Sequence, residues 1–275
     1  MNIAYFGGDW YLDCLKVFEN HGHAIQHIFV NNEQSYNIKL REYAALNKIP
    51  LSLEKPNKQQ LSLLNNQGID CIYSSEYPWL IPVSGTGLKS INMHPTLLPD
   101  GRGPTPLIWL LKKYPEYAGV TFHKLSDEFD CGDIVYQQKI SLNTNETWET
   151  LVARLHIQVP VYLDELLSNF DTYYENAQSQ QVGSYWPKIE LSDRTVSWNM
   201  NVSEIQQLTR ACGRFGVVTN FADVTLLVNH IQVSQCHHQY PPGILIKEDE
   251  ETYVISASDG IVVILKRDIT ESLGE

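Results

Sequence analysis

Strand-like and helix-like segments alternate over the first 75 residues, and this alternation constrains the fold more than any other feature of the chain. Short apolar runs that end in turn residues predict strands, and the segments between them carry apolar residues at helical spacing. The expected strands are 2–6, 24–30, 50–53 and 71–73, and the expected helices are 10–20, 38–46 and 61–66. This β-α-β-α order predicts an α/β fold with a doubly wound, mainly parallel sheet and helices on both faces.

A doubly wound sheet predicts where a ligand binds, because ligands lie beyond the carboxyl ends of its strands. Gly7-Gly8, residues 74–82 and the segment after Asn92 follow expected strands, so they should meet on one rim. The complete G-x-G-x-x-G pattern is absent here. Gly7-Gly8 therefore indicates a tight turn beside a ligand and not a dinucleotide fingerprint.

The pattern of the chain changes after a long amphipathic helix at 147–170, which Pro160 is expected to kink or divide. A helix at 203–212 and then short strands separated by turn residues follow, which predicts a small OB-like β-barrel or a sandwich. The expected C-terminal strands are 224–228, 231–233, 244–246, 253–256 and 261–265. The expected division is an N-terminal domain at 1–182, a linker at 183–202 and a C-terminal domain at 203–275.

Charge and cysteine content narrow the function classes. The net charge of −12 argues against a nucleic-acid partner, since no basic cluster offsets it in either half of the chain. The five cysteines are widely spaced and odd in number, which is typical of free thiols in a reducing compartment, so we expect a cytoplasmic protein. No signal peptide and no apolar run long enough for a membrane span is expected. Cys236-His237-His238 is not expected to bind a metal, because neighbouring strand residues face opposite sides.

Two stretches, 90–104 and 119–133, carry the candidate chemistry. The period of a strand places Asn92 and His94 on one face, and Asp130 after a second strand is expected opposite them. This set suits acyl transfer to an amine: an amide stabilises the charge on the carbonyl oxygen by about 3 kcal/mol, and an imidazole beside a carboxylate moves a proton. Taken singly, each residue also has a structural interpretation, and Asp130 could serve only as a turn former.

In combination these residues resemble the signature of the formyltetrahydrofolate-dependent transferases. The Asn-x-His of that family matches Asn92 and His94, its Leu-Leu-Pro loop matches 97–99, and its Asp before Gly matches Asp130. The 36 positions from His94 to Asp130 agree with the spacing of the family. The resemblance implies a Rossmann-like formyltransferase domain, 10-formyltetrahydrofolate as co-substrate, and Asn92, His94 and Asp130 as the catalytic residues.

The resemblance extends to binding residues. Residues 77–82 resemble the loop that lines the pterin pocket, and 185–188 with 193–198 resemble the join to the C-terminal domain of the tRNA and sugar enzymes. The residues implied for folate binding are Tyr77, Pro78, Trp79, Leu80, Ile81, Leu125, Asp127 and Phe129. Those expected to contact the acceptor are Gly8, Trp10 and Arg102.

The first loop favours one branch of this family. The tRNA enzymes typically begin with a strand ending in Gly-Thr-Pro, whereas Gly7-Gly8-Asp9-Trp10 is closer to the sugar N-formyltransferases. We therefore expect formyl transfer to the amine of a nucleotide-linked amino sugar in polysaccharide biosynthesis. Methionyl-tRNA formyltransferase, an enzyme that formylates a hydroxyornithine-type amine for a siderophore, and a folate-binding module without activity are the alternatives. A homodimer is left open, and no metal is expected.

Overall fold

The computed structural model describes residues 1–32 and 34–272. The chain divides into two compact units, each of which is described by itself. The first comprises Met1–Pro106, Tyr117–Ser141 and Ala153–Trp186, and the second comprises Leu107–Glu116, Leu142–Val152 and Pro187–Glu275. The helices are α1 (Asp13–Asn20), α2 (Ile38–Leu46), α3 (Lys58–Asn66), α4 (Pro106–Lys112), α5 (Trp148–Ser168), α6 (Phe170–Glu175) and α7 (Val202–Cys212).

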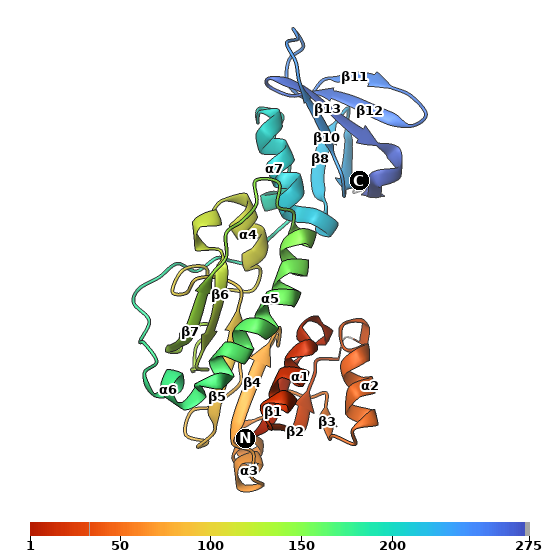
Figure 1. Cartoon of the computed structure of the whole chain (residues 1–275). Coiled ribbons are helices and arrows are strands. Elements are labelled where there is room, and N and C mark those ends of the chain that lie inside the picture. Colours follow the sequence, from red (N-terminus) through yellow and green to blue (C-terminus); the bar gives the residue numbers. More distant parts are fainter. Residues whose placement is uncertain (33, 273–275) are drawn as a thin grey trace. The chain divides into compact units, whose positions relative to one another are not determined.

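A seven-stranded sheet with the order β3-β2-β1-β4-β5-β6-β7 forms the centre of the first unit (Figure 1). Its strands are β1 (Asn2–Gly7), β2 (Ala24–Phe29), β3 (Leu51–Ser52), β4 (Cys71–Ser75), β5 (Lys89–His94), β6 (Gly119–His123) and β7 (Ile134–Lys139). The pairs from β3 across to β5 are parallel, whereas β5 with β6 and β6 with β7 are antiparallel. The sheet is therefore mainly parallel, as predicted.

Helices cover both faces of this sheet because successive strand residues point to opposite sides. On one face Tyr73 of β4 contacts Phe18 of α1, with ring centroids 5.1 Å apart. On the other face Ile72 joins a buried apolar cluster that includes Leu61 and Leu64 of α3. The two-sided burial explains why these strands are almost uniformly apolar. The carboxyl ends of β4 and β5 are left free to form a site.

The second unit contains two antiparallel sheets, with the orders β10-β13-β12-β11 and β14-β9-β8. Their strands are β8 (Val217–Phe221), β9 (Val224–Val228), β10 (Gln232–Gln235), β11 (Leu245–Glu248), β12 (Thr252–Ser256), β13 (Gly260–Leu265) and β14 (Ile269–Ser272). The predicted small all-β region after a helix is confirmed. Within residues 187–272 no strand pairing joins the two sheets into the closed barrel that was expected.

Several details differ from the sequence prediction. The expected helix at 10–20 starts with a separate 3-10 turn, η1 (Asp9–Tyr11), and α5 continues as one helix through Pro160. Strands β7, β8 and β14 were not predicted. All five cysteines are free. No helix in the described part of the chain is long and apolar enough to cross a membrane. The domain boundaries at 182 and 202 remain a prediction.

Candidate active site

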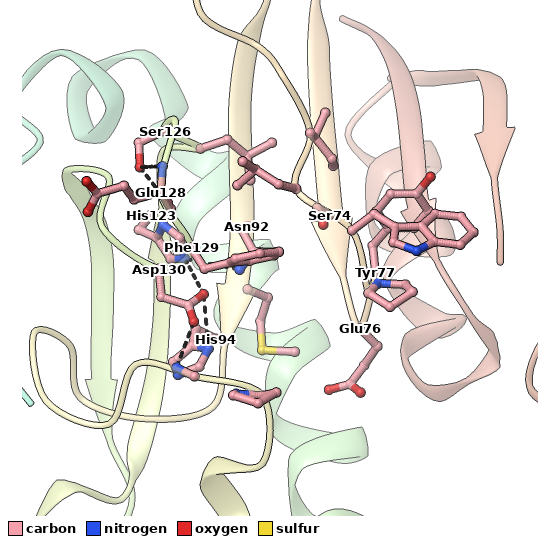
Figure 2. A pocket seen from close by; sticks show the side chains of 18 of the residues that line it. Ser74, Glu76, Tyr77, Asn92, His94, His123, Ser126, Glu128, Phe129 and Asp130 are labelled. Carbon is pink, nitrogen blue, oxygen red and sulfur yellow. Dashed lines mark hydrogen bonds and ion pairs between the residues drawn. The ribbon is translucent and has the colours of Figure 1, made fainter. Parts of the chain in front are cut away.

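A cavity of about 430 Å³ opens beyond the carboxyl ends of β4 and β5, within the first unit (Figure 2). This volume lies in the range of small-molecule sites. Asn92, His94 and Asp130 all line it, so the structure brings the three predicted catalytic residues together. Asn92 and His94 lie on β5, and Asp130 lies in the loop between β6 and β7. The position of the cavity agrees with the rim predicted from the strand order.

Asn92 is oriented by a histidine on the neighbouring strand. In the antiparallel register of β5 and β6, His123 lies directly opposite Asn92. His123 Nδ1 is 2.8 Å from the carbonyl oxygen of Lys124, which can only accept, so Nδ1 carries the proton. His123 Nε2 therefore accepts from the Asn92 amide at 3.0 Å. This bond fixes which end of the amide is the NH₂ group, and a second N–H of Asn92 remains for the pocket.

The same reasoning identifies the basic nitrogen of His94. His94 Nε2 is 2.8 Å from the carbonyl oxygen of Gly101, so Nε2 donates and carries a proton. His94 Nδ1 faces Asp130 Oδ1 at 3.4 Å. Burial lowers the pKa of His94, and the nearby Asp130 carboxylate only partly opposes this effect. At neutral pH Nδ1 is therefore an unprotonated base, and Asp130 is placed to stabilise the imidazolium once it forms.

Asp130 is held as a carboxylate by three groups. Burial alone would raise its pKa, but attraction to His94 and His123 whenever either imidazole is protonated, together with the backbone N–H of Gly103, keeps that pKa well below its usual range. Gly103 N–H donates to Asp130 Oδ2 at 3.0 Å, and His123 Nε2 lies 3.6 Å from Oδ1. Asp130 itself has φ of +57°, a left-handed conformation that a side chain adopts at some cost. Such a residue persists only where its surroundings fix it, as they do here.

Sequence reasoning missed His123. The residue was placed on a strand, but its role depends on the pairing of β6 beside β5, and short-range patterns do not report which strands pair. Asn92 and His123 are 31 positions apart. A histidine at the carboxyl end of a strand that follows the Asn-x-His motif was the available signal.

The residues implied for folate binding largely gather in the same cavity. Those that line it are Tyr77, Pro78, Trp79, Leu80, Ile81, Leu125 and Phe129. Asp127 is not among the lining residues, although its neighbours Ser126 and Glu128 are. Tyr77 and Trp79 meet edge to face at 5.4 Å. The side chains predicted to bind folate that line this half of the pocket are aromatic or apolar.

The residues expected to contact the acceptor lie outside the lining of this cavity. Arg102 donates to Gln180 Oε1 through Nε at 3.1 Å and through Nη2 at 2.8 Å. Gln180 in turn donates to the carbonyl oxygens of Asp130 and Gly132. Arg102 therefore braces the loop that carries Asp130. Trp10 packs against His156 at 5.7 Å, and Gly8 lies next to the backbone of Tyr36.

Comparison with known proteins agrees with this arrangement. The Formyl transferase family matches residues 19–165, and the Formyl transferase C-terminal domain family matches residues 188–271. The methionyl-tRNA formyltransferase of Pseudothermotoga lettingae is 31% identical over 175 residues, which cover 63% of this chain and 58% of that enzyme. The corresponding enzyme of Coprothermobacter proteolyticus is 25% identical over 282 residues, which cover 96% of this chain and 91% of that enzyme.

Solved structures share the fold. The N-formyltransferase of Helicobacter canadensis, solved in complex with folinic acid and dTDP-3-aminofucose, superimposes with a TM-score of 0.65. The match covers 96% of this chain and 98% of that one at 18% identity. At this identity the likeness concerns the architecture alone.

Proposed function

The chain belongs to the formyl transferase family, and from this premise we propose that it transfers a formyl group from 10-formyltetrahydrofolate to the amine of a nucleotide-linked amino sugar. The observation that carries the transfer is the convergence of Asn92, His94 and Asp130 on one cavity of suitable size. The folate-bound Helicobacter canadensis enzyme of the same fold supports the choice of donor. The five free thiols agree with a reducing compartment, and we propose the cytoplasm.

Asn92 is proposed to stabilise the charge that develops during attack. The acceptor nitrogen bonds to the formyl carbon, and the carbonyl oxygen becomes negative before the bond to the folate nitrogen breaks. One N–H of Asn92 is engaged by His123, which holds the amide in place for the other N–H to meet this oxygen. A donor fixed in advance reorganises little during the reaction, and this is the basis of its contribution of about 3 kcal/mol.

His94 is proposed to move the proton that the attack releases. The nitrogen that has attacked is positively charged, and His94 Nδ1 is the unprotonated base beside it. Asp130, at 3.4 Å from Nδ1, stabilises the imidazolium until the proton passes to the departing folate nitrogen. The attraction between Asp130 and His94 is strongest when the imidazole is protonated, so it stabilises the charged intermediate more than the resting state.

The folate is expected in the aromatic half of the cavity. Tyr77 to Ile81 on one side and Leu125 with Phe129 on the other form a slot for a flat ring, and backbone groups can pair with its polar edge. A crystal structure with folinic acid should place the pterin between these segments. Density for the pterin on the C-terminal sheets would contradict this assignment.

The choice of acceptor rests on charge. A tRNA enzyme must neutralise several phosphates, and its binding then falls steeply with salt. This chain carries a net charge of −12, and its two pairs of adjacent basic residues are partly engaged: Lys112 is hydrogen-bonded to the carbonyl oxygen of Asp193, and Lys266 is ion-paired with Glu248. A nucleotide sugar presents only a diphosphate. Methionyl-tRNA formyltransferase remains the second candidate function, because relatives at 31% and 25% sequence identity carry that name.

A panel of acceptors should separate the two candidates. With 10-formyltetrahydrofolate as donor, we expect a mass gain of one formyl group on a nucleotide amino sugar such as dTDP-3-aminofucose or a UDP-linked amino sugar. Charged initiator tRNA and hydroxyornithine should stay unmodified. The parallel measurement is a tRNA binding titration at about 50 mM salt, where electrostatic attachment is strongest. Tight, salt-sensitive binding together with formylation of the tRNA would instead establish the tRNA activity.

A further inference from the structure

A second ionisable group lies in the same cavity, across from the catalytic residues. Glu76 immediately follows β4 and lines the pocket. In the parallel register of β4 and β5, Ser74 pairs with Asn92 and Ser75 with Met93. Continuing this register by one residue brings Glu76 level with His94. Figure 2 shows the two side chains on opposite sides of the cavity, with Asn92 on the same strand as His94.

Glu76 has no internal structural role that accounts for a carboxylate. Within residues 1–32 and 34–272 it forms neither a hydrogen bond nor an ion pair, and it is open to the cavity. Its φ is +58°, so the backbone holds this side chain in a conformation that favours glycine. An unpaired carboxylate held at a costly backbone conformation inside a ligand cavity indicates a role toward the ligand.

The titratable groups that interact with Glu76 are neutral. The phenol groups of Tyr5 on β1 and Tyr11 in η1 are close enough to be affected by its charge, and burial raises the pKa of each, so both are uncharged. The carboxylates of Glu128 and Asp130 line the same cavity. His94 on β5 is neutral for the reason given above. Enclosure by protein on the sides away from the cavity raises the pKa of Glu76 to about 7. A carboxylate of this kind gains from a cationic partner and can hold a proton near neutral pH.

The proposed reaction needs such a group because the acceptor loses two protons. An aliphatic amine has a pKa of roughly 8 to 10, so near pH 7 it arrives as an ammonium ion without a lone pair. One proton must leave before attack, and the second leaves after the nitrogen–carbon bond forms. His94 is buried and passes the second proton to the folate nitrogen. His94 cannot also take the first proton, because its Nδ1 must be unprotonated when the amine attacks.

We propose that Glu76 binds the ammonium group of the acceptor and takes up its first proton. This inference rests on the proposed function. The proton moves from nitrogen to the carboxylate, which becomes a neutral carboxylic acid, and the freed lone pair attacks the formyl carbon. Glu76 is open to the cavity and returns the proton to water, so each turnover releases one proton. Glu76, which is open to the cavity, therefore takes the first proton, and the buried His94 takes the second.

The test compares Glu76→Gln with the wild-type protein, using the nucleotide amino sugar that the acceptor panel identifies. We expect kcat/KM for the acceptor to fall about 100-fold at pH 7, with KM for 10-formyltetrahydrofolate unchanged. The pH profiles should differ in shape. Wild-type kcat/KM should level off above about pH 7, where Glu76 is ionised. The variant should keep rising, about tenfold per pH unit, until the amine itself deprotonates.

Glu128→Gln is the matched control, because it removes one carboxylate from the lining of the same cavity. The carboxylate of Glu128 points away from Asn92 and His94 in Figure 2, so this variant should keep the wild-type shape of the pH profile of kcat/KM for the acceptor. If Glu76 had only a structural role, Glu76→Gln would lower kcat/KM by the same factor at every pH, and its pH profile would keep the wild-type shape. That result would overturn the inference. If the wild-type protein formylates no amino sugar, the proposed function itself fails, and the role of Glu76 fails with it.

Discussion

Replacing His94 by alanine is expected to lower turnover by about 100-fold or more while the protein stays folded. The variant loses the neutral base that faces Asp130 at 3.4 Å and is not already engaged by the Asn92 amide, so the proton released by attack loses its proposed acceptor. Asn92→Ala and Asp130→Ala should each reduce turnover by a similar factor, because the three groups act on the same charged intermediate. Single-turnover formyl transfer, followed by mass spectrometry, measures the effect.

His27→Ala is the matched control for this series. His27 is a half-buried histidine on β2 of the same sheet, and it hydrogen-bonds to Ser52 away from the cavity. Its loss should leave turnover within about twofold, since no transition-state contact is removed. Circular dichroism and thermal melting verify that each variant is folded. Near-normal turnover in His94→Ala would show that the assigned proton path is wrong.

The second large effect is expected from Gly103→Ala. Gly103 has φ of +123°, and a Cβ atom there would lie 2.1 Å from the carbonyl oxygen of Trp186. Backbone cannot yield as a flexible side chain does, so the turn must shift. We expect the free energy of unfolding to fall by about 2 to 4 kcal/mol. Turnover should fall as well, because the displaced N–H of Gly103 no longer holds Asp130 Oδ2.

Gly22→Ala separates steric overlap from backbone preference. Gly22 also has a positive φ, +71°, but a Cβ atom there would meet no atom within 4 Å. This variant should lose only about 1 kcal/mol, the conformational cost of a left-handed alanine. Urea denaturation measures the loss in free energy of unfolding of each variant, provided that the m-values stay unchanged. Equal losses in the two variants would contradict the view that the Gly103–Trp186 contact is critical.

The spacing of apolar residues along the chain predicted helices and strands whose bounds depend on neighbouring residues in the sequence. The helix at 38–46 and the strand at 224–228 have the bounds that were expected. Strand β7 was missed because its apolar run covers only its first half, and the three residues that follow are polar and exposed. The 3-10 turn η1 was merged with α1, since both share apolar residues at helical spacing.

The candidate site was predictable to the extent that its residues share a strand or a motif. Asn92 and His94 follow from the period of two along β5. His123 and Glu76 depend on which strands are neighbours and in what register, and a single sequence does not contain that information in readable form. Arg102 was expected to contact the acceptor from its place beside a motif, and its guanidinium is hydrogen-bonded to Gln180. Its proposed contact with the acceptor remains to be tested.

The turn at 101–103 joins the two halves of the proposed proton path through main-chain atoms alone. The carbonyl of Gly101 fixes the protonated nitrogen of His94, and the N–H of Gly103 fixes the carboxylate of Asp130. Every residue except proline supplies both of those peptide groups, so the proposed chemistry tolerates changes in the side chains that flank the turn as long as its backbone conformation survives. Side chains near this turn can therefore change without a change in the proposed reaction.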